Sequence, residues 1–254
     1  EVVLNRLLDF AYRQYLQAKI DNNETYIEDN TQAHYGWYFF GAPGTGKTHA
    51  VKSLAQGLKL PIASMNISDL SAEDILGSKE KKGALIEAML QASQVSTHHN
   101  CHNMILFIDE LDRTINRDDP QSRQLLARTL ELLDPRKDTF YSPYFESDIP
   151  KPSIVVAAGN SALEDEALKD RFEELEFSLF SIETKKKIVY EKIIPELLKG
   201  YQKLIADRKQ TLKLNLADKE AINKIIQSDN ESGLRSIEKK IRAYLEKKLR
   251  SYHY

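Results

Sequence analysis

The sequence predicts an α/β fold, in which helices cover a mostly parallel sheet and an all-helical segment follows. Short apolar runs of strand length alternate with longer amphipathic runs through residues 1–179. Only helical periodicity remains after about Phe180. Several of the short runs are apolar at every position, as expected for parallel strands buried on both faces. We therefore expect two domains, residues 1–179 and 180–254.

Four runs fit buried strands and a fifth is a further candidate. In chain order they are Trp37–Phe40, Ile62–Met65, Met104–Ile108, Ile154–Ala158 and the fifth candidate, Leu175–Leu179. Between them, apolar residues recur at helical spacing from Ala50 to Leu58 and from Leu125 to Leu133. Asp119-Pro120 suits the start of the second helix, since it offers a cap acceptor and then a first-turn proline.

The last third of the chain shows three helical patterns, at Ile188–Leu198, Ala221–Ile226 and Leu234–Leu249. In the last of these, leucine and isoleucine form one stripe and lysine and arginine occupy the opposite face. Such a charged face is usually solvated. It therefore gives only weak support to a nucleic-acid partner.

Composition excludes several classes of protein. The chain has 254 residues, and 36 Lys and Arg against 38 Asp and Glu leave a formal net charge of -2, so nucleic acid is an unlikely partner. The single cysteine, Cys101, excludes an internal disulfide and favours the cytoplasm or another reducing compartment. No apolar run approaches the roughly twenty residues of a membrane span, so we expect no membrane segment.

A glycine-rich segment follows the first strand and precedes an amphipathic helix. It reads Gly41, Ala42, Pro43, Gly44, Thr45, Gly46, Lys47 and Thr48. This spacing is the P-loop pattern, in which converging backbone N–H groups and a helix N-terminus bind a phosphate. Lys47 would contact the outer phosphates, and the Thr48 hydroxyl would be a ligand of Mg²⁺. The segment therefore predicts a site for ATP and Mg²⁺.

Two carboxylates follow directly after the strand at Met104–Ile108. Asp109 and Glu110 should lie at the carboxyl edge of the sheet, where the phosphate loop also opens. Asp109 would hold Mg²⁺ and Glu110 would polarise the attacking water. A carboxylate beside the magnesium ligand favours hydrolysis over transfer to another acceptor.

With these motifs, the chain resembles an AAA+ ATPase, and within that class the ATPase module of the Lon proteases. The likeness runs from about Gly36 to Leu249. The resembling stretches are the P-loop with Phe107–Asp112, the segment Leu130–Pro135 with its continuation to Ser161, and Glu231–Glu238. The resemblance implies a P-loop parallel sheet sandwiched by helices, followed by a small all-helical lid domain. It also implies ATP hydrolysis, a homo-oligomeric ring of six subunits and a protein substrate.

The resemblance also assigns roles to single residues. Asn160 matches the sensor that orients the attacking water, Arg171 the arginine finger that reaches a neighbouring subunit, and Arg235 the second sensor. Phe180 and Ile188 fall where related modules line the adenine pocket. Asn160 also fits a cap after a strand, and both arginines fit ordinary surface positions.

The chain departs from the Lon pattern at two places. No candidate serine–lysine dyad of a peptidase is present within the 254 residues. Ile75-Leu76-Gly77-Ser78 occupies the place of the pore loop, whose first residue is aromatic in the family. Ile75 could still grip a polypeptide there, or it could pack beneath the loop as local core.

Two alternative functions stay open. A nucleotide-gated scaffold would hold ATP with little turnover, and a nucleic-acid motor would use the basic face of the last helix. His98, His99, Cys101 and His102 could together bind a metal, but their segment is polar and no other ligand accompanies it. We expect no physiological metal site there.

Overall fold

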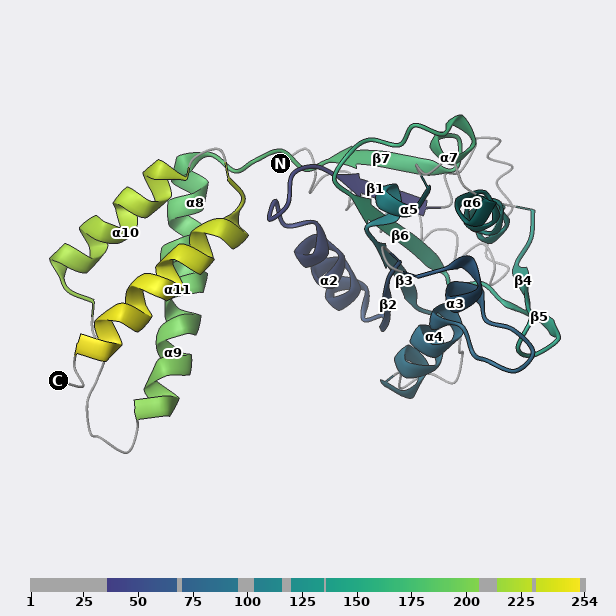
Figure 1. The fold of residues 1–254 in the computed structure, drawn as a ribbon, viewed down its shortest axis with the longest axis horizontal. Helices are drawn as coiled ribbons and strands as arrows, with labels where there is room; N and C mark the ends of the chain where they lie inside the picture. Colours follow the sequence, from purple (N-terminus) through teal and green to yellow (C-terminus); the bar gives the residue numbers. More distant parts are fainter. Residues whose placement is uncertain are drawn as a thin grey trace, which may run out of the picture. The chain divides into compact units, whose positions relative to one another are not determined.

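The computed structural model describes residues 36–67, 70–95, 103–115, 120–134, 136–205, 214–229 and 232–251 (Figure 1). They fall into two compact units. One consists of residues up to Gly41 together with Lys47–Phe177, and the other of Ala42–Gly46 together with Ser178–Tyr254.

A five-stranded parallel sheet forms the centre of the first unit. Its strands are β1 (Gly36–Phe40), β2 (Ile62–Asn66), β3 (Ile105–Asp109), β6 (Ile154–Gly159) and β7 (Phe172–Glu176), in the spatial order β2-β3-β6-β1-β7. The central strands β3 and β6 are almost entirely buried, which is why their sequences are continuously apolar. The predicted parallel α/β sheet is confirmed.

The last strand differs from the expected segment. β7 begins three residues before the predicted Leu175–Leu179 and shares with it only Leu175 and Glu176. As an edge strand it buries Phe172 and Leu175 and leaves its glutamates partly exposed, so it lacks the continuous apolar pattern of a central strand.

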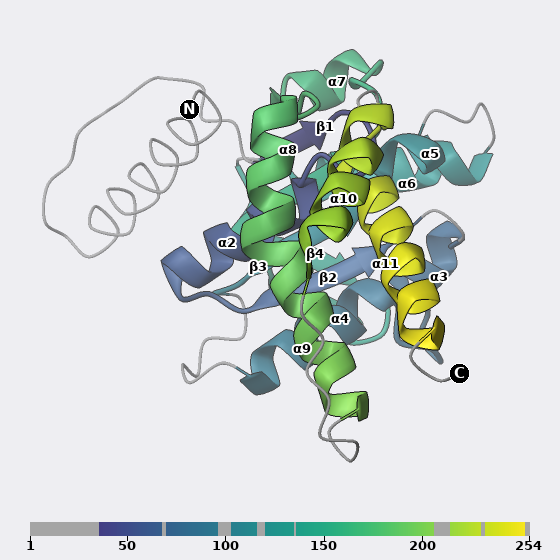
Figure 2. The ribbon, with the colours of Figure 1, turned by 90° about the vertical axis from the view of Figure 1, so that its left-hand side faces the viewer.

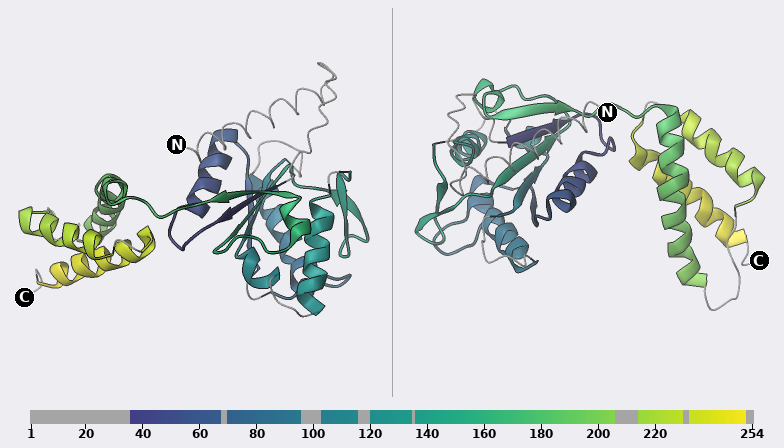
Figure 3. Two further views of the ribbon diagram at one scale, coloured as in Figure 1. Left: turned by 90° about the horizontal axis from the view of Figure 1, so that it is seen from above. Right: turned by 180° about the vertical axis from the view of Figure 1, so that it is seen from behind.

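Helices cover both faces of the sheet (Figure 3). Helix α2 (Lys47–Leu58) packs on one face through Val51 and Ala55. The other face is covered by helices α3 (Ala72–Leu76), α4 (Ala84–Val95), α5 (Leu111–Ile115) and α6 (Pro120–Leu132). Helix α6 begins at the predicted proline. The short helix α7 (Glu166–Lys169) links β6 to β7.

A second, antiparallel sheet was not expected from the sequence. Strands β4 (Thr139–Ser142) and β5 (Ser147–Pro150) form a two-stranded hairpin. Its turn carries Tyr144 and Phe145, whose rings pack edge to face with centroids 5.2 Å apart. Phe145 is among the most exposed large apolar side chains of the described residues.

The second unit is helical apart from its phosphate-loop segment. Helix α8 (Ile182–Ile188), the π-turn Val189–Ile193 and helix α9 (Ile194–Ile205) form one continuous run, beside which lie α10 (Leu216–Ser228) and α11 (Leu234–Ser251) (Figure 2). Pro195 has no N–H for the carbonyl four residues earlier, and the preceding π-turn accommodates that loss. The core includes Val189, Ile222, Ile237 and Ile241. No helix of the described residues is long and apolar enough to span a membrane.

Candidate functional site

Three adjacent strands bring the sequence-predicted residues to one edge of the sheet. β1 pairs with β6 so that Phe40 lies opposite Gly159, and the next residues, Gly41 and Asn160, leave the sheet side by side. β3 pairs with β6 on its other side and ends in Asp109. Because parallel strands place their carboxyl ends on one edge, Gly41 at the start of the loop, the acidic pair and Asn160 all lie at that edge.

The phosphate loop has the conformation that its glycines permit. Gly41, Gly44 and Gly46 all have positive φ, at 141°, 78° and 96°, which other residues rarely adopt. The buried Thr45 hydroxyl donates to the Ala42 carbonyl at 2.9 Å and closes the loop.

Helix α2 starts directly after the loop, with Lys47 and Thr48 as its first two residues. The first N–H groups of a helix have no intrahelical partner, and no acidic residue occupies this first turn to compete for them. The Lys47 ammonium donates to the Gly41 carbonyl at 2.5 Å, and Thr48 is exposed. The loop and this helix start suit an anionic ligand with a bound cation.

The acidic pair lies at the turn from β3 into α5. The Glu110 N–H donates to Asp109 Oδ1 at 3.1 Å, and both residues are partly exposed. Glu110 has a φ of 61°, a left-handed conformation that is strained for a non-glycine residue. Its carboxylate accepts from Arg113 at 3.3 Å. Strain held at such a turn is typical of functional positions.

Asn160 is exposed just beyond β6, and its backbone is fixed by a residue that sequence reasoning missed. Asp112 is 7 % exposed and accepts from the Asn160 N–H at 2.8 Å. Asp112 is the third acid of the segment Asp109–Asp112, and such a cluster of acids is visible in the sequence. Its partner, however, lies 48 residues away, so the signal did not reveal the contact.

Arg171 does not lie at this edge. It precedes β7, whose first residue, Phe172, pairs with Gly36 at the opposite, amino end of β1. Five strand residues separate the two edges by about 16 Å. The Arg171 guanidinium donates to the Ala167 carbonyl at 3.1 Å, and its Nε is buried without a partner. Arg171 therefore lies at the opposite edge of the sheet from Gly41, Asp109 and Asn160.

The remaining candidates belong to the second unit. The Arg235 N–H lies 3.0 Å from where a Cβ on Gly44 would stand, so the start of α11 contacts the loop. The Phe180 ring lies 3.5 Å from the corresponding point on Gly46. Ile188, at the end of α8, is partly buried. Both units therefore hold part of the predicted residue set.

Comparison with known proteins identifies the family. The profile of the ATPase family associated with various cellular activities (AAA) matches residues 37–179. The chain belongs to this family. The matched residues include the phosphate loop, Asp109, Glu110, Asn160 and Arg171, and they end before helix α8.

Relatives of this AAA chain include proteins named Lon protease. It is 27 % identical over 221 residues to one from Campylobacter concisus, covering 82 % of the chain and 25 % of the relative. It is 29 % identical over 209 residues to one from Flavobacterium johnsoniae, covering 79 % and 24 %. A Lon protease homolog of Acanthamoeba polyphaga mimivirus is 26 % identical over 217 residues, covering 81 % and 20 %. The chain thus spans about a quarter of these proteins or less, and the resemblance to a Lon-type ATPase module is confirmed.

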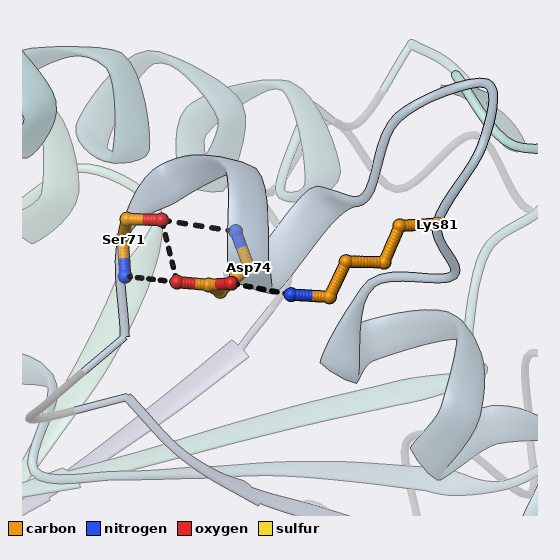
Figure 4. A network of polar contacts seen from close by, with 3 residues as sticks. All are labelled: Ser71, Asp74 and Lys81. Atoms are coloured by element: carbon orange, nitrogen blue, oxygen red, sulfur yellow. Dashed lines mark hydrogen bonds and ion pairs between the residues drawn. The ribbon is translucent and has the colours of Figure 1, made fainter.

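Ile75, which occupies the place of the pore loop, does not have the exposed side chain that gripping a polypeptide requires. Ile75 is 2 % exposed and packs in the main apolar core, so it is a core residue of this AAA chain. Its helix α3 is fixed by a polar network (Figure 4), in which Asp74 accepts from the Ser71 hydroxyl and from Lys81, each at 2.7 Å. The short turn that follows is closed by a bridge between Gly77 and Lys82. A buried side chain cannot contact a passing polypeptide.

The histidine-rich segment His98–His102 lies outside the described residues. Among the residues that are described, no group of three or more His, Cys, Asp or Glu could hold a metal ion. The Mg²⁺ ligands expected from the sequence, Thr48 and Asp109, are only two, as is usual where phosphates and water complete the coordination.

Proposed function

We propose that this AAA chain binds ATP with Mg²⁺ and hydrolyses it. The observation that carries the proposal is that three features follow adjacent strands at one sheet edge. They are Gly41, where the phosphate loop begins after β1, Asp109-Glu110 after β3 and Asn160 after β6. A loop and helix start for phosphates, beside a carboxylate pair, suit phosphoryl transfer to water.

The residues fit the two groups that the reaction needs. The loop glycines at positive φ and the acid-free first turn of α2 suit phosphate oxygens. Lys47 would hold the outer phosphates, and Thr48 with Asp109 would hold Mg²⁺. When bound, Mg²⁺ supplies charge stabilisation to the phosphoryl oxygens.

The remaining residues of this edge act on the nucleophile. Glu110 would polarise the attacking water and accept its proton, and Asn160 would orient that water. In the helical unit, Arg235 would sense the phosphates, while Phe180 and Ile188 would line the adenine pocket. Residues 1–179 and 180–254 would then be the nucleotide-binding domain and its lid.

Arg171 is proposed to act on a neighbouring subunit. Its place at the opposite edge of the sheet from Asp109, Glu110 and Asn160 supports a site completed by a second copy. A finger supplied in trans is worth about 10³-fold or more in related enzymes. By analogy with the family, the assembly would be a ring of six subunits.

A polypeptide is the proposed substrate of the mechanical work. Support comes from the relatives named Lon protease, and the net charge of -2 disfavours nucleic acid. Cys101 as the single cysteine supports the cytoplasm or another reducing compartment.

The test is ATP turnover and binding in the full-length protein. Glu110→Gln should bind ATP normally and hydrolyse it about 10²- to 10⁴-fold more slowly, since only the water-activating carboxylate is lost. Lys47→Ala should lose binding. Glu87→Gln and Lys52→Ala, exposed on α4 and α2, are matched controls that should behave as wild type. Wild-type turnover by Glu110→Gln would overturn the assignment, and ATP binding without turnover in the wild type would favour a nucleotide-gated scaffold.

A further inference from the structure

Asp112 is a buried carboxylate that contacts the segment after β6 through two backbone N–H groups and one side-chain hydroxyl. It lies at the start of α5, beside the fully buried Leu111. Its Oδ2 accepts from the N–H of Asn160 at 2.8 Å and from the N–H and hydroxyl of Ser161, each at 3.3 Å. Hydrogen bonds to a charged acceptor are stronger than those between neutral groups, particularly where water is excluded.

The same segment is held from a second side by Tyr38. Its hydroxyl donates to the Ser161 carbonyl at 2.7 Å. Burial, and then the charges of Asp112 and Glu174, raise the pKa of Tyr38, so the phenol stays a neutral donor. Asp112 therefore binds the N–H groups of Asn160 and Ser161, and Tyr38 binds the carbonyl of Ser161.

No room remains for a side chain at Gly159, the last residue of β6. A Cβ on Gly159 would meet the Tyr38 hydroxyl, and it would lie 2.8 Å from the Asp112 carboxylate. Only glycine fits where the chain passes between these two side chains. In the described part of the chain, the Asn160 side chain is exposed and makes no hydrogen bond of its own, so its direction depends on this backbone.

The carboxylate also belongs to the segment that carries the catalytic acids. Asp112 follows Glu110 by two residues, and the Glu110 N–H is itself bonded to Asp109. A single turn of chain thus holds both acids at its start and, through Asp112, the backbone of Asn160. We infer that Asp112 is a positioning residue, which sets the distance between the water-activating Glu110 and the water-orienting Asn160. This inference rests on the proposed function.

The step that depends on this spacing is attack by water. If Asn160 moves by about 1 Å, water is no longer held in line, and such a displacement can cost about 100-fold in rate. ATP affinity should change little, since the phosphate contacts lie on the loop. The predicted signature is therefore a loss in kcat without a loss in binding.

The experiment compares Asp112→Ala with Asp112→Asn in the full-length protein. Asp112→Ala should lower kcat about 10- to 100-fold while the Kd for ATP stays within about threefold. Asp112→Asn keeps an oxygen acceptor for the Asn160 N–H and should recover most of the rate. Ser161→Ala removes one donor without touching Asn160, and should cost less than about threefold. A weakened Kd, or Asp112→Asn as slow as Asp112→Ala with both folded, would overturn the inference.

Two further measurements separate this inference from the proposed function. Amide hydrogen exchange of the peptide spanning residues 159–161 needs no turnover. It should be faster in Asp112→Ala than in wild type and near wild type in Asp112→Asn. In a double-mutant cycle, Asp112→Ala should add little to Asn160→Ala, because both act on one water. If the rate losses of the two single variants multiply in the double variant, the positioning role of Asp112 is refuted but the proposed function is not. If the wild type does not turn over ATP, the proposed function is refuted.

Discussion

The Leu234 N–H donates a hydrogen bond to the Gly44 carbonyl at 3.0 Å, so the first residue of α11 is bonded to the phosphate loop. The preceding residue, Gly233, lies so close that a Cβ there would meet the Pro43 carbonyl and would stand 2.9 Å from the Gly44 Cα. Arg235 follows next in the chain. The start of α11 is therefore packed directly against the loop within the helical unit.

Gly233→Ala should disturb this contact. The added methyl group faces backbone atoms, which cannot rotate away, so the loop must separate from α11. We expect weaker ATP binding, by about tenfold, and a lower melting temperature. Isothermal titration and thermal unfolding measure the two effects.

The matched control is Gly200→Ala, on α9 of the same unit. A Cβ there meets nothing within 4 Å. Alanine in place of an unconstrained helical glycine should stabilise by about 0.5–1 kcal/mol. If Gly233→Ala binds ATP as tightly as Gly200→Ala, the loop does not depend on the close approach of Gly233.

Glu110→Gly should relieve backbone strain and so stabilise the fold, while it removes the carboxylate that hydrolysis needs. Glu110 has a φ of 61°, which glycine adopts without strain. We expect Glu110→Gly to be more stable than Glu110→Gln by about 0.5–1 kcal/mol in urea unfolding, although both variants should hydrolyse ATP far more slowly than wild type. Lys59, just after α2, has a φ of 56°, so Lys59→Gly should gain similar stability and keep its activity. A Glu110→Gly variant less stable than Glu110→Gln would show that no strain is stored there.

Sequence periodicity and motif position predicted most of the sheet and of the candidate edge, because both depend on local pattern. The central strands are buried on both faces and therefore consist of apolar runs. Parallel strands then fix one edge for whatever follows them, so the amino-acid sequence alone was enough to place Gly41, Asp109 and Asn160 together.

The features that were missed depend on long-range contacts. Asp112 resembles one more helix-start acid until its bond to Asn160 is seen. The β4–β5 hairpin exposes more than half of its strand residues and has no glycine in its turn, so neither a continuous apolar run nor a glycine turn marks it. Ile75 looked equally suited to a surface loop and to the core, and only the packing of α3 decides between them.

The stability of the helical unit should fall in acid through Asp229, at the end of α10. Hydrogen bonds from Ser236, at 2.6 Å, and then from Lys240 and Ser232 lower the pKa of Asp229 to about 2, although burial opposes them. Since the folded pKa is below the ordinary value of 3.8, this carboxylate stabilises fully above about pH 4. That contribution is lost as the pH falls towards 2.

The comparison of wild type with Asp229→Asn isolates this group from the other acids. Urea midpoints should differ by a constant amount between about pH 5 and 7, and the difference should shrink below pH 4. A difference that stays constant down to pH 3 would mean that Asp229 acts without its charge.

Ile75→Tyr should destabilise the fold rather than add grip on a substrate. Ile75 packs against the core that α3, α4 and α6 build over the sheet, and it is 2 % exposed. A tyrosine ring there must overpack this core and bury its hydroxyl, at a cost of about 1–3 kcal/mol. Ile75→Val removes one methylene and should cost about 0.5–1.5 kcal/mol. Phe145→Ala, at the exposed hairpin turn, should change stability by less than about 0.5 kcal/mol. Urea unfolding of the three variants gives this ranking, and an Ile75→Tyr variant as stable as wild type would show that the residue faces solvent.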